Sequence, residues 1–324
     1  MLRLLIPTGS GYTWIEHSPP APFPDEFLWA DLFEPTVEEE RAVESLLTVD
    51  VPTRDEMREI ETSNRLYEED GAVYMTATVG SKLDSATPES SAITFILANN
   101  RLITNRYADP TPVGRFMTHV ERSPAACTSS ATLLAGLLEA FVERIADLLE
   151  GVQTELESVS HSIFQRSNGN TTSGGDLKSM IQRIGANGDL VSKARESLVS
   201  FQRLLMYVQQ ASNVSLSQDQ RGRFKSTLRD VQSLSDHATF LGNKIQFLLD
   251  AVLGLINLEQ NNIIKIFSVA AVVFLPPTLV ASIYGMNFRH MPELDWLAGY
   301  PMAIVFMVLS AVVPYAYFKR KRWL

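Results

Sequence analysis

The sequence predicts a membrane protein with an N-terminal α/β domain, a long helical stalk and two C-terminal transmembrane helices. Strand signals are confined to the first 125 residues, helical periodicity follows them, and two charge-free runs lie near the C-terminal end. Residues 263–324 carry a net charge of +4 and residues 1–262 a net of −13, within a total of −9. Such asymmetry indicates a membrane or polyion partner, and the acidic body argues against nucleic acid.

Residues 1–126 are expected to form a compact cytosolic α/β domain. The chain opens with an apolar run that is too short for a signal peptide and is better explained as a first strand. Thr36 can cap a helix whose first turn is acidic, and a second helix is expected over residues 53–61. Further strands are expected over residues 29–32, 71–79, 91–98 and 101–105, the last two joined by the turn pair Asn99-Asn100.

Strand signals stop near Cys127, and residues 127–213 are expected to form a cytosolic helical region. Apolar residues recur at three- and four-residue spacings from Ala131 to Gln165, and a second helix is expected from Leu177 to Ala211. Residues 167–175 between them are polar and Gly-rich. A phosphate loop is one interpretation, but no strand precedes this stretch and no Lys-Ser/Thr pair ends it, so a connection between helices is favoured.

The third helical stretch is expected within residues 214–284, from near Ser217 into the first transmembrane span. An apolar stripe that alternates three- and four-residue steps predicts a packing seam: Leu228, Val231, Leu234, Ala238, Leu241, Ile245, Leu248, Val252 and Leu255. A second stripe recurs every seven residues: Asp236, Asn243, Asp250, Asn257, Ile264, Ala271, Thr278 and Gly285, with Asn261 and Leu275 close to it. Solvent exposure alone explains its polar start. Within the membrane there is no solvent on the outside of a helix, so Thr278 on this stripe would face lipid. The stripe therefore predicts a pore lining.

Two charge-free runs of 23 residues each, Ile266–Phe288 and Trp296–Phe318, predict the transmembrane helices. Each run reaches roughly 35 Å as a helix, enough for a hydrocarbon core of about 30 Å. We expect spans at residues 263–284 and 300–318, joined by an outer loop over residues 285–299. A pair of buried core helices is the alternative, which two such runs in succession disfavour.

Basic residues set the expected orientation. Lys319–Arg322 follow the second span directly, so residues 319–324 are expected to be a cytosolic tail. Two spans then put the N-terminus in the cytoplasm as well. Since two helices cannot enclose a water-filled path, a pore requires several copies of the chain.

The first span ends in Tyr284-Gly285-Met286-Asn287-Phe288, and Met291-Pro-Glu293-Leu follows in the loop. This pattern resembles the CorA family of divalent-cation channels, whose signature is Gly-Met-Asn at the outer end of the first of two C-terminal spans. The terminal Lys-Arg-Lys-Arg-Trp-Leu and the run Trp29–Thr36 are also similar to the family.

The resemblance implies a funnel-shaped homopentamer in the bacterial inner membrane. Mg²⁺ would flow inward along the membrane potential, with Co²⁺ and Ni²⁺ as further ions. The implied selectivity filter is Gly285, Met286 and Asn287. The expected pore lining continues with Thr278, Asn261, Asn257 and Asp250, and the implied apolar gate comprises Leu275, Ala271, Phe267 and Ile264. In the family, Mg²⁺ bound between cytosolic domains closes the pore, and Asp230 and Asp236 are the candidates here.

The chemistry agrees with Mg²⁺ as substrate and regulatory ligand. Mg²⁺ dehydrates reluctantly and prefers oxygen ligands, so neutral Asn287 oxygens could hold the hydrated ion and still release it. The alternative is a zinc transporter of the same superfamily, which the scarcity of His and Cys near the pore disfavours. An anchored enzyme is not expected, because the sequence has no nucleophile elbow, no phosphate loop and no paired metal ligands. A scaffold without transport would leave the polar stripe unexplained.

Overall fold

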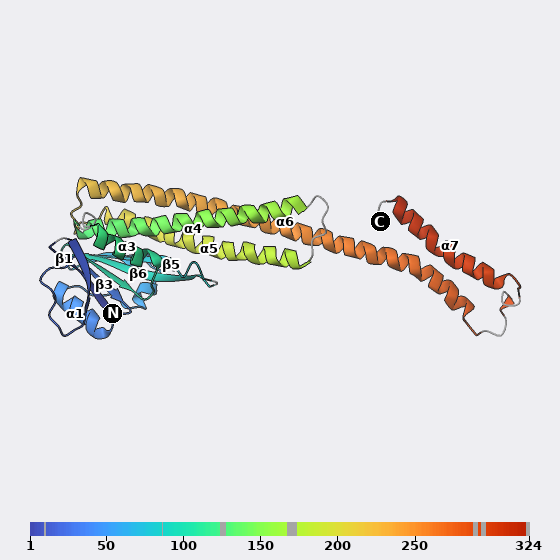
Figure 1. Cartoon of the computed structure of the whole chain (residues 1–324), viewed down its shortest axis with the longest axis horizontal. Coiled ribbons are helices and arrows are strands. Elements are labelled where there is room, and N and C mark those ends of the chain that lie inside the picture. The colour runs from blue at the N-terminus through green and yellow to red at the C-terminus, as the bar shows by residue number, and fades with distance from the viewer. Residues whose placement is uncertain are drawn as a thin grey trace. The chain divides into compact units, whose positions relative to one another are not determined.

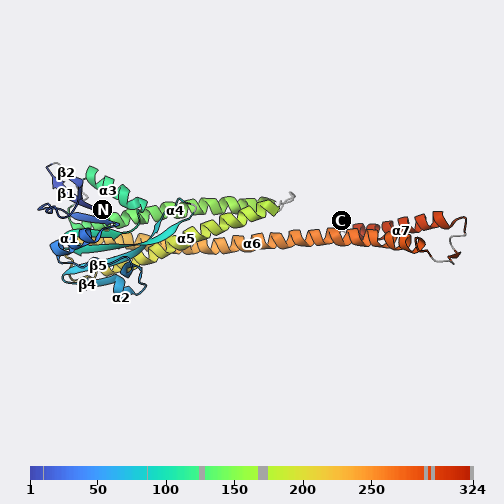
Figure 2. The ribbon, with the colours of Figure 1, turned by 90° about the horizontal axis from the view of Figure 1, so that it is seen from below.

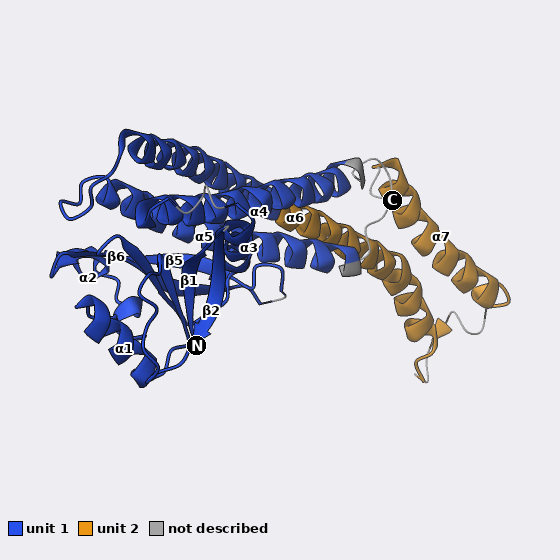
Figure 3. Ribbon diagram, turned by 60° about the vertical axis from the view of Figure 1, so that its left-hand side comes forward, with its two compact units in different colours: residues 1–249 blue, residues 250–324 orange. Residues whose placement is uncertain are grey.

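The computed structural model describes residues 1–9, 11–85, 87–123, 128–166, 174–287, 291–292 and 296–321. The chain divides into two compact units, residues 1–249 and residues 250–324 (Figure 3). Within these residues, strands occur only in the first part of unit 1 and helices follow (Figure 1), as the sequence predicts.

Unit 1 contains a seven-stranded sheet in the order β2-β1-β3-β7-β6-β5-β4. All neighbouring strands are antiparallel except the parallel pair β3 and β7. Asn99 and Asn100 have φ values of 50° and 59°, as a two-residue hairpin between β6 and β7 requires. The predicted strands are confirmed, and β2 and β4 join them. The bounds are β1 Leu2–Thr8, β2 Gly11–His17, β3 Trp29–Phe33, β4 Leu66–Glu69, β5 Ala72–Ser81, β6 Glu89–Ala98 and β7 Arg101–Arg106.

Helix α1, Val37–Leu47, begins at the predicted cap. Thr36 accepts from the backbone N–H of Glu39 and Glu39 accepts from that of Thr36, which is a capping box. The predicted helix over residues 53–61 is wrong: only the 3₁₀ turn η1, Glu56–Arg58, lies there, and the one-turn helix α2, Thr62–Arg65, follows. Only Met57 is buried in this stretch, and too few apolar contacts exist to offset the cost of starting a helix.

Two helical layers enclose the sheet. Helix α1 packs on one face with Val43 and Leu47 in the core, and α4 and α5 lie on the other side (Figure 1). At the parallel pair, Arg106 donates two 2.9 Å hydrogen bonds to the Asp31 carboxylate. Although burial lowers the pKa of Arg106, the hydrogen bonds and charge of Asp31 raise it overall. This buried ion pair fixes β3 against β7.

Long helices make up the rest of unit 1. After α3, Thr111–Arg122, come α4, Ser130–Arg166, and α5, Gly174–Val208. The predicted tip between α4 and α5 lies mostly outside the described residues. Helix α6, Gln218–Tyr284, has 67 residues and confirms the uninterrupted third helix. The members of its apolar seam are all buried or half-buried, with Val231, Leu241 and Leu248 at 0% exposure.

Unit 2 consists of the C-terminal part of α6 and of helix α7, Gly299–Arg320 (Figure 3). Both helices have an 18-residue window apolar enough to cross a membrane, and only 6% of each window is buried. Pro276 and Pro277 lie inside α6. Because proline has no N–H, the carbonyls of Val272 and Val273 lose their usual helical donors.

Candidate ion pathway along α6

The predicted pathway residues all lie on α6 or directly after it. The predicted residues from Asp250 to Thr278 share one side of α6. Most of them recur every seven residues, and seven residues are close to two full helical turns. Asn257 and Asn261 are exposed there, and Asp250 continues the stripe toward unit 1. One continuous helix therefore carries the whole predicted lining.

The filter residues lie where α6 ends. The N–H of Gly285 donates to the carbonyl of Ala281 at 2.9 Å, and that of Met286 to Ile283 at 3.3 Å. A Cβ at Gly285 would lie 3.1 Å from the Ala281 oxygen, so a side chain there would force a small backbone shift. Asn287 follows with an exposed side chain. The C-terminal end of a helix carries the negative end of its dipole, which makes this end attractive to cations.

The predicted gate residues present large apolar side chains. Ile264, Phe267 and Leu275 are 61%, 71% and 66% exposed in the single chain. Ala271 and Thr278 are exposed on the same side, and the Thr278 hydroxyl donates to the Phe274 carbonyl at 2.8 Å. An apolar surface of this extent requires lipid or further protein to cover it.

The two candidate sensor residues have different surroundings. Both are exposed on α6, and Asp230 lines a groove of about 370 Å³ with Glu139 and Glu143 of α4. Asp236 does not line this groove. Within the described residues of one chain, no three His, Cys, Asp or Glu side chains form a group that could hold a metal ion.

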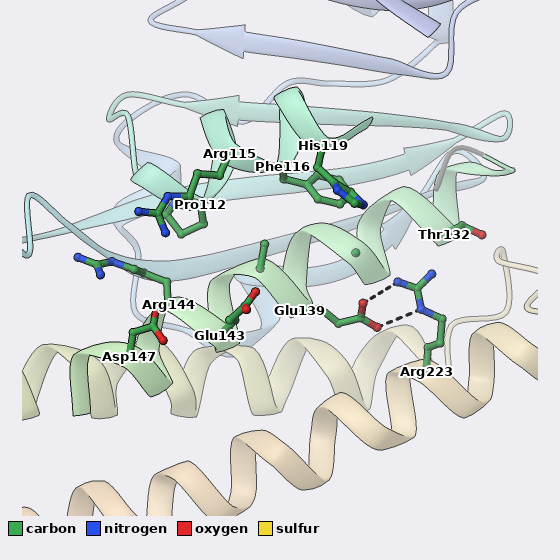
Figure 4. A pocket seen from close by; sticks show the side chains of 12 residues that line it. Pro112, Arg115, Phe116, His119, Thr132, Glu139, Glu143, Arg144, Asp147 and Arg223 are labelled. Carbon is green, nitrogen blue, oxygen red and sulfur yellow. Dashed lines mark hydrogen bonds and ion pairs between the residues drawn. The ribbon is translucent and has the colours of Figure 1, made fainter. Parts of the chain in front are cut away.

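The sequence analysis missed the acidic side of α4. Glu139, Glu143 and Asp147 follow one another at four-residue steps and line a second cavity, where Figure 4 shows them on α4 beneath α3. Glu139 forms an ion pair with Arg223 of α6 at 2.6 Å. The four-residue spacing of these acids is visible in the sequence, but the closeness of Glu139 and Glu143 to Asp230 depends on how α4 packs against α6.

The α/β domain and the two apolar helices, one of which is the end of the 67-residue α6, define the class of two-span membrane proteins with a large N-terminal domain. The family described as "CorA-like Mg2+ transporter protein" matches residues 24–320. The chain therefore belongs to the CorA family, whose members are transporters and not enzymes.

Individual relatives agree with this assignment. The chain is 38% identical over 298 residues to the magnesium transport protein CorA of Salmonella typhimurium, covering 92% of each chain. The complete structure of the CorA magnesium transporter from Methanocaldococcus jannaschii matches with a TM-score of 0.77 at 18% identity, covering 100% of this chain and 99% of that one. The ZntB cytoplasmic domain of Vibrio parahaemolyticus shares the fold with a TM-score of 0.57 at 12% identity, covering 79% and 97%.

Proposed function

We propose that this protein carries Mg²⁺ into the cell through a pore lined by α6. The observation that carries the proposal is the position of Gly285-Met286-Asn287 at the end of an apolar helix, in a chain 38% identical to magnesium transport proteins. We propose the inner membrane as its location, with both termini in the cytoplasm. The membrane potential would supply about 4.6 kcal/mol per 100 mV for a divalent ion.

The pore is proposed to form between copies of the chain, as a homopentamer with α6 inside and α7 outside. The exposed side chains of unit 2 support this arrangement, since the two helices bury little of their own surface. Contact with neighbouring copies would cover one side of α6, and lipid would cover α7.

Selection of the ion is assigned to Asn287 together with Gly285 and Met286. A ring of Asn287 amide oxygens and backbone carbonyls offers neutral ligands to an ion that keeps its water shell. Neutral oxygens bind such an ion weakly enough for release. This ligand set also suits Co²⁺ and Ni²⁺, which we propose as further substrates.

The gate is proposed to be apolar. Rings of Ile264 and Leu275, with Phe267 and Ala271 between them, would leave a neck too dry for a hydrated ion in the closed state. Thr278 would lie next to this neck, where Pro276 and Pro277 leave the helix without two of its hydrogen bonds.

Regulation by cytosolic Mg²⁺ is assigned to acidic residues of unit 1. Several bodies of high negative charge around one axis repel each other, and divalent ions between them would relieve that repulsion. Asp230 and Asp236 are proposed ligands, and the nearby acids Glu139 and Glu143 are available to Asp230. Loss of these ions would loosen the ring and widen the gate.

Transport of Zn²⁺ remains the alternative within the fold. Soft or borderline metals favour His and Cys ligands. Along the described part of the proposed pathway, from Asp250 to Asn287, there is neither His nor Cys. The ligand chemistry therefore favours Mg²⁺.

The test is ion entry into liposomes that contain the purified full-length protein and a trapped Mg²⁺ indicator. An inside-negative potential should accelerate Mg²⁺ entry, and a reversed potential should slow it. The same assay with Zn²⁺ separates the two substrates. Entry of Zn²⁺ without entry of Mg²⁺ would overturn the proposal.

A further inference from the structure

Two adjoining cavities lie in unit 1 beside the start of strand β4, whose first residue Leu66 lines one of them. Strand β4 pairs only with Ala72–Met75, so β5 has no β4 partner from Thr76 onward. There the backbone N–H groups of Thr78 and Gly80 donate to Ser200 and Ser197 of α5, at 2.9 and 3.0 Å. The cavities, of about 450 and 520 Å³, open beside this contact and share Arg65, Thr78 and Glu196. Their volumes fall in the usual range of small-molecule sites.

The lining of these cavities is basic although the chain as a whole carries a charge of −9. Only two acidic side chains, Glu89 and Glu196, take part in it. Six basic side chains come from two stretches of the chain, residues 54–65 and helix α5: Arg54, Arg58, Arg65, Lys193, Arg195 and Arg203. We call this surface the basic groove. Figure 2 shows α2, β4 and β5 gathered on the same side of unit 1.

Among the described residues, the acids of the basic groove form no ion pair with its cations. Glu89 is paired with Lys82 at 2.9 Å, and Glu196 accepts a 2.8 Å hydrogen bond from Ser90. Among the described residues, only two of the six cations have a carboxylate within 4.0 Å: Arg58 and Lys193, both at 3.8 Å. The positive charge of the groove is thus largely unpaired within one chain.

Arg65 occupies the centre, because it lines both cavities and is half-buried. Among the described residues its guanidinium donates to three neutral oxygens, namely the Thr78 hydroxyl at 2.9 Å, the Glu59 carbonyl and the Met57 carbonyl at 3.5 Å. Burial lowers the pKa of Arg65, and the charge of Arg203 lowers it further against the opposing effect of Glu196. A guanidinium has five donors, so this fixed one keeps capacity for an anion.

The larger cavity also contains a hydroxyl group without a hydrogen-bond partner among the described residues. Ser91 lines the larger cavity, and its Oγ is buried without a hydrogen-bond partner in the described part of the chain. Near the mouth of the other cavity, Ile60 is 88% exposed and offers apolar surface. Cations, one unpaired hydroxyl and one exposed apolar side chain therefore line the two cavities.

We propose that the basic groove binds a soluble phosphate-bearing anion with several charges, such as a polyphosphate or a nucleoside triphosphate. Planar guanidinium groups match phosphate oxygens in pairs. Cations spread over two connected cavities suit a chain of phosphates better than a single carboxylate. This binding is separate from the proposed transport function, and the cavity residues lie outside the ion pathway.

Calorimetric titration of the full-length protein in detergent tests the proposal, with tripolyphosphate and ATP as probes in Mg²⁺-free buffer. Both should bind, more weakly at high salt. The variant Arg195→Gln/Arg203→Gln removes two exposed cations that make no ion pair, and should weaken binding at least about tenfold. The control Arg41→Gln/Lys178→Gln removes two exposed cations elsewhere and should bind as the parent does.

A second variant, Arg65→Lys, retains the charge but loses the planar fork, and it should also weaken binding. Equal affinities for the two probes would mean that the phosphate chain is recognised, and tighter ATP binding would add the nucleoside; both support the site. Absence of heat with either probe at millimolar concentration would contradict it. Equal binding by the double variant and its control would also contradict the site. The same holds if the double variant changes the number of chains in the oligomer and still binds both probes.

Discussion

The two units of this chain differ in how far their large apolar side chains are buried. In residues 1–249, Trp29 and Phe95 are fully buried, whereas Phe267 and Leu275 of residues 250–324 are mostly exposed. Unit 1 therefore has its own hydrophobic core, and unit 2 leaves a large apolar surface that lipid and the proposed further chains would cover. Changes in unit 1 should act mainly on stability and regulation, and changes on one side of α6 should act on transport.

The largest expected effect is at the end of α6. Asn287→Ala removes the amide oxygens that are proposed to hold the hydrated ion, so Mg²⁺ uptake into liposomes should fall to the background of empty vesicles. Asn287 is exposed, and its loss should leave the oligomer assembled. Light scattering checks the assembly, and Ile283→Leu one turn earlier serves as a control. Normal uptake by Asn287→Ala would refute its role as the selecting residue.

A change within the proposed gate should produce a leak. Leu275→Gly opens one apolar ring and should raise Mg²⁺ flux when internal Mg²⁺ is high and the pore is closed. Val273→Gly introduces the same flexible residue on the opposite side of α6 and should leave closed-state flux unchanged. If both variants leak equally, loss of helix rigidity is the cause and Leu275 is no gate.

In unit 1 the largest effect should be on folding. Asp31→Asn breaks the ion pair with fully buried Arg106 and should lower the free energy of unfolding by about 3–5 kcal/mol. Asp84→Asn breaks the pair with Arg144, in which Asp84 is 77% exposed, and should cost about 0–1 kcal/mol. Thermal unfolding of both variants measures the difference. Equal losses would mean that burial does not determine the importance of these pairs.

The smallest expected effect concerns regulation. Asp230→Asn/Asp236→Asn should raise the internal Mg²⁺ concentration needed for half-inhibition by a few-fold, since bound divalent ions would lose two of their ligands. Ion selectivity should not change. The exposed acids Asp25 and Glu26 provide a control of equal charge. An unchanged Mg²⁺ dependence would exclude Asp230 and Asp236 and direct attention to Glu139 and Glu143.

Local chemistry made much of the fold predictable. Asn99-Asn100 and Thr36 act through contacts a few residues apart, and both predictions are confirmed. The helix predicted over residues 53–61 does not form. Thr53 and Glu56 make the hydrogen bonds of a helix cap, but almost no side chain beyond them is buried. A helix of this length needs tertiary contacts, which a local pattern cannot supply.

The ion pathway could be predicted from the sequence because its residues lie along a single helix. The position of Asn287 after α6 depends on helix length and on a short motif, both of which can be read along the chain. The basic groove could not be predicted in this way, since it unites Arg54 and Arg65 with Arg203 of the distant helix α5. The same holds for Asp230 and Glu143, which only the packing of α6 on α4 brings to one groove.

The central claim is that one side of α6 lines the ion path, and cysteine accessibility tests it most directly. The sequence has a single cysteine, Cys127, so Cys127→Ser gives a cysteine-free parent. In that background, Thr278→Cys and Val280→Cys place a thiol on opposite sides of the helix, two residues apart. A cationic thiol reagent applied outside should stop Mg²⁺ uptake by Thr278→Cys and leave Val280→Cys active. Equal responses of the two variants would contradict a pathway along this side of α6.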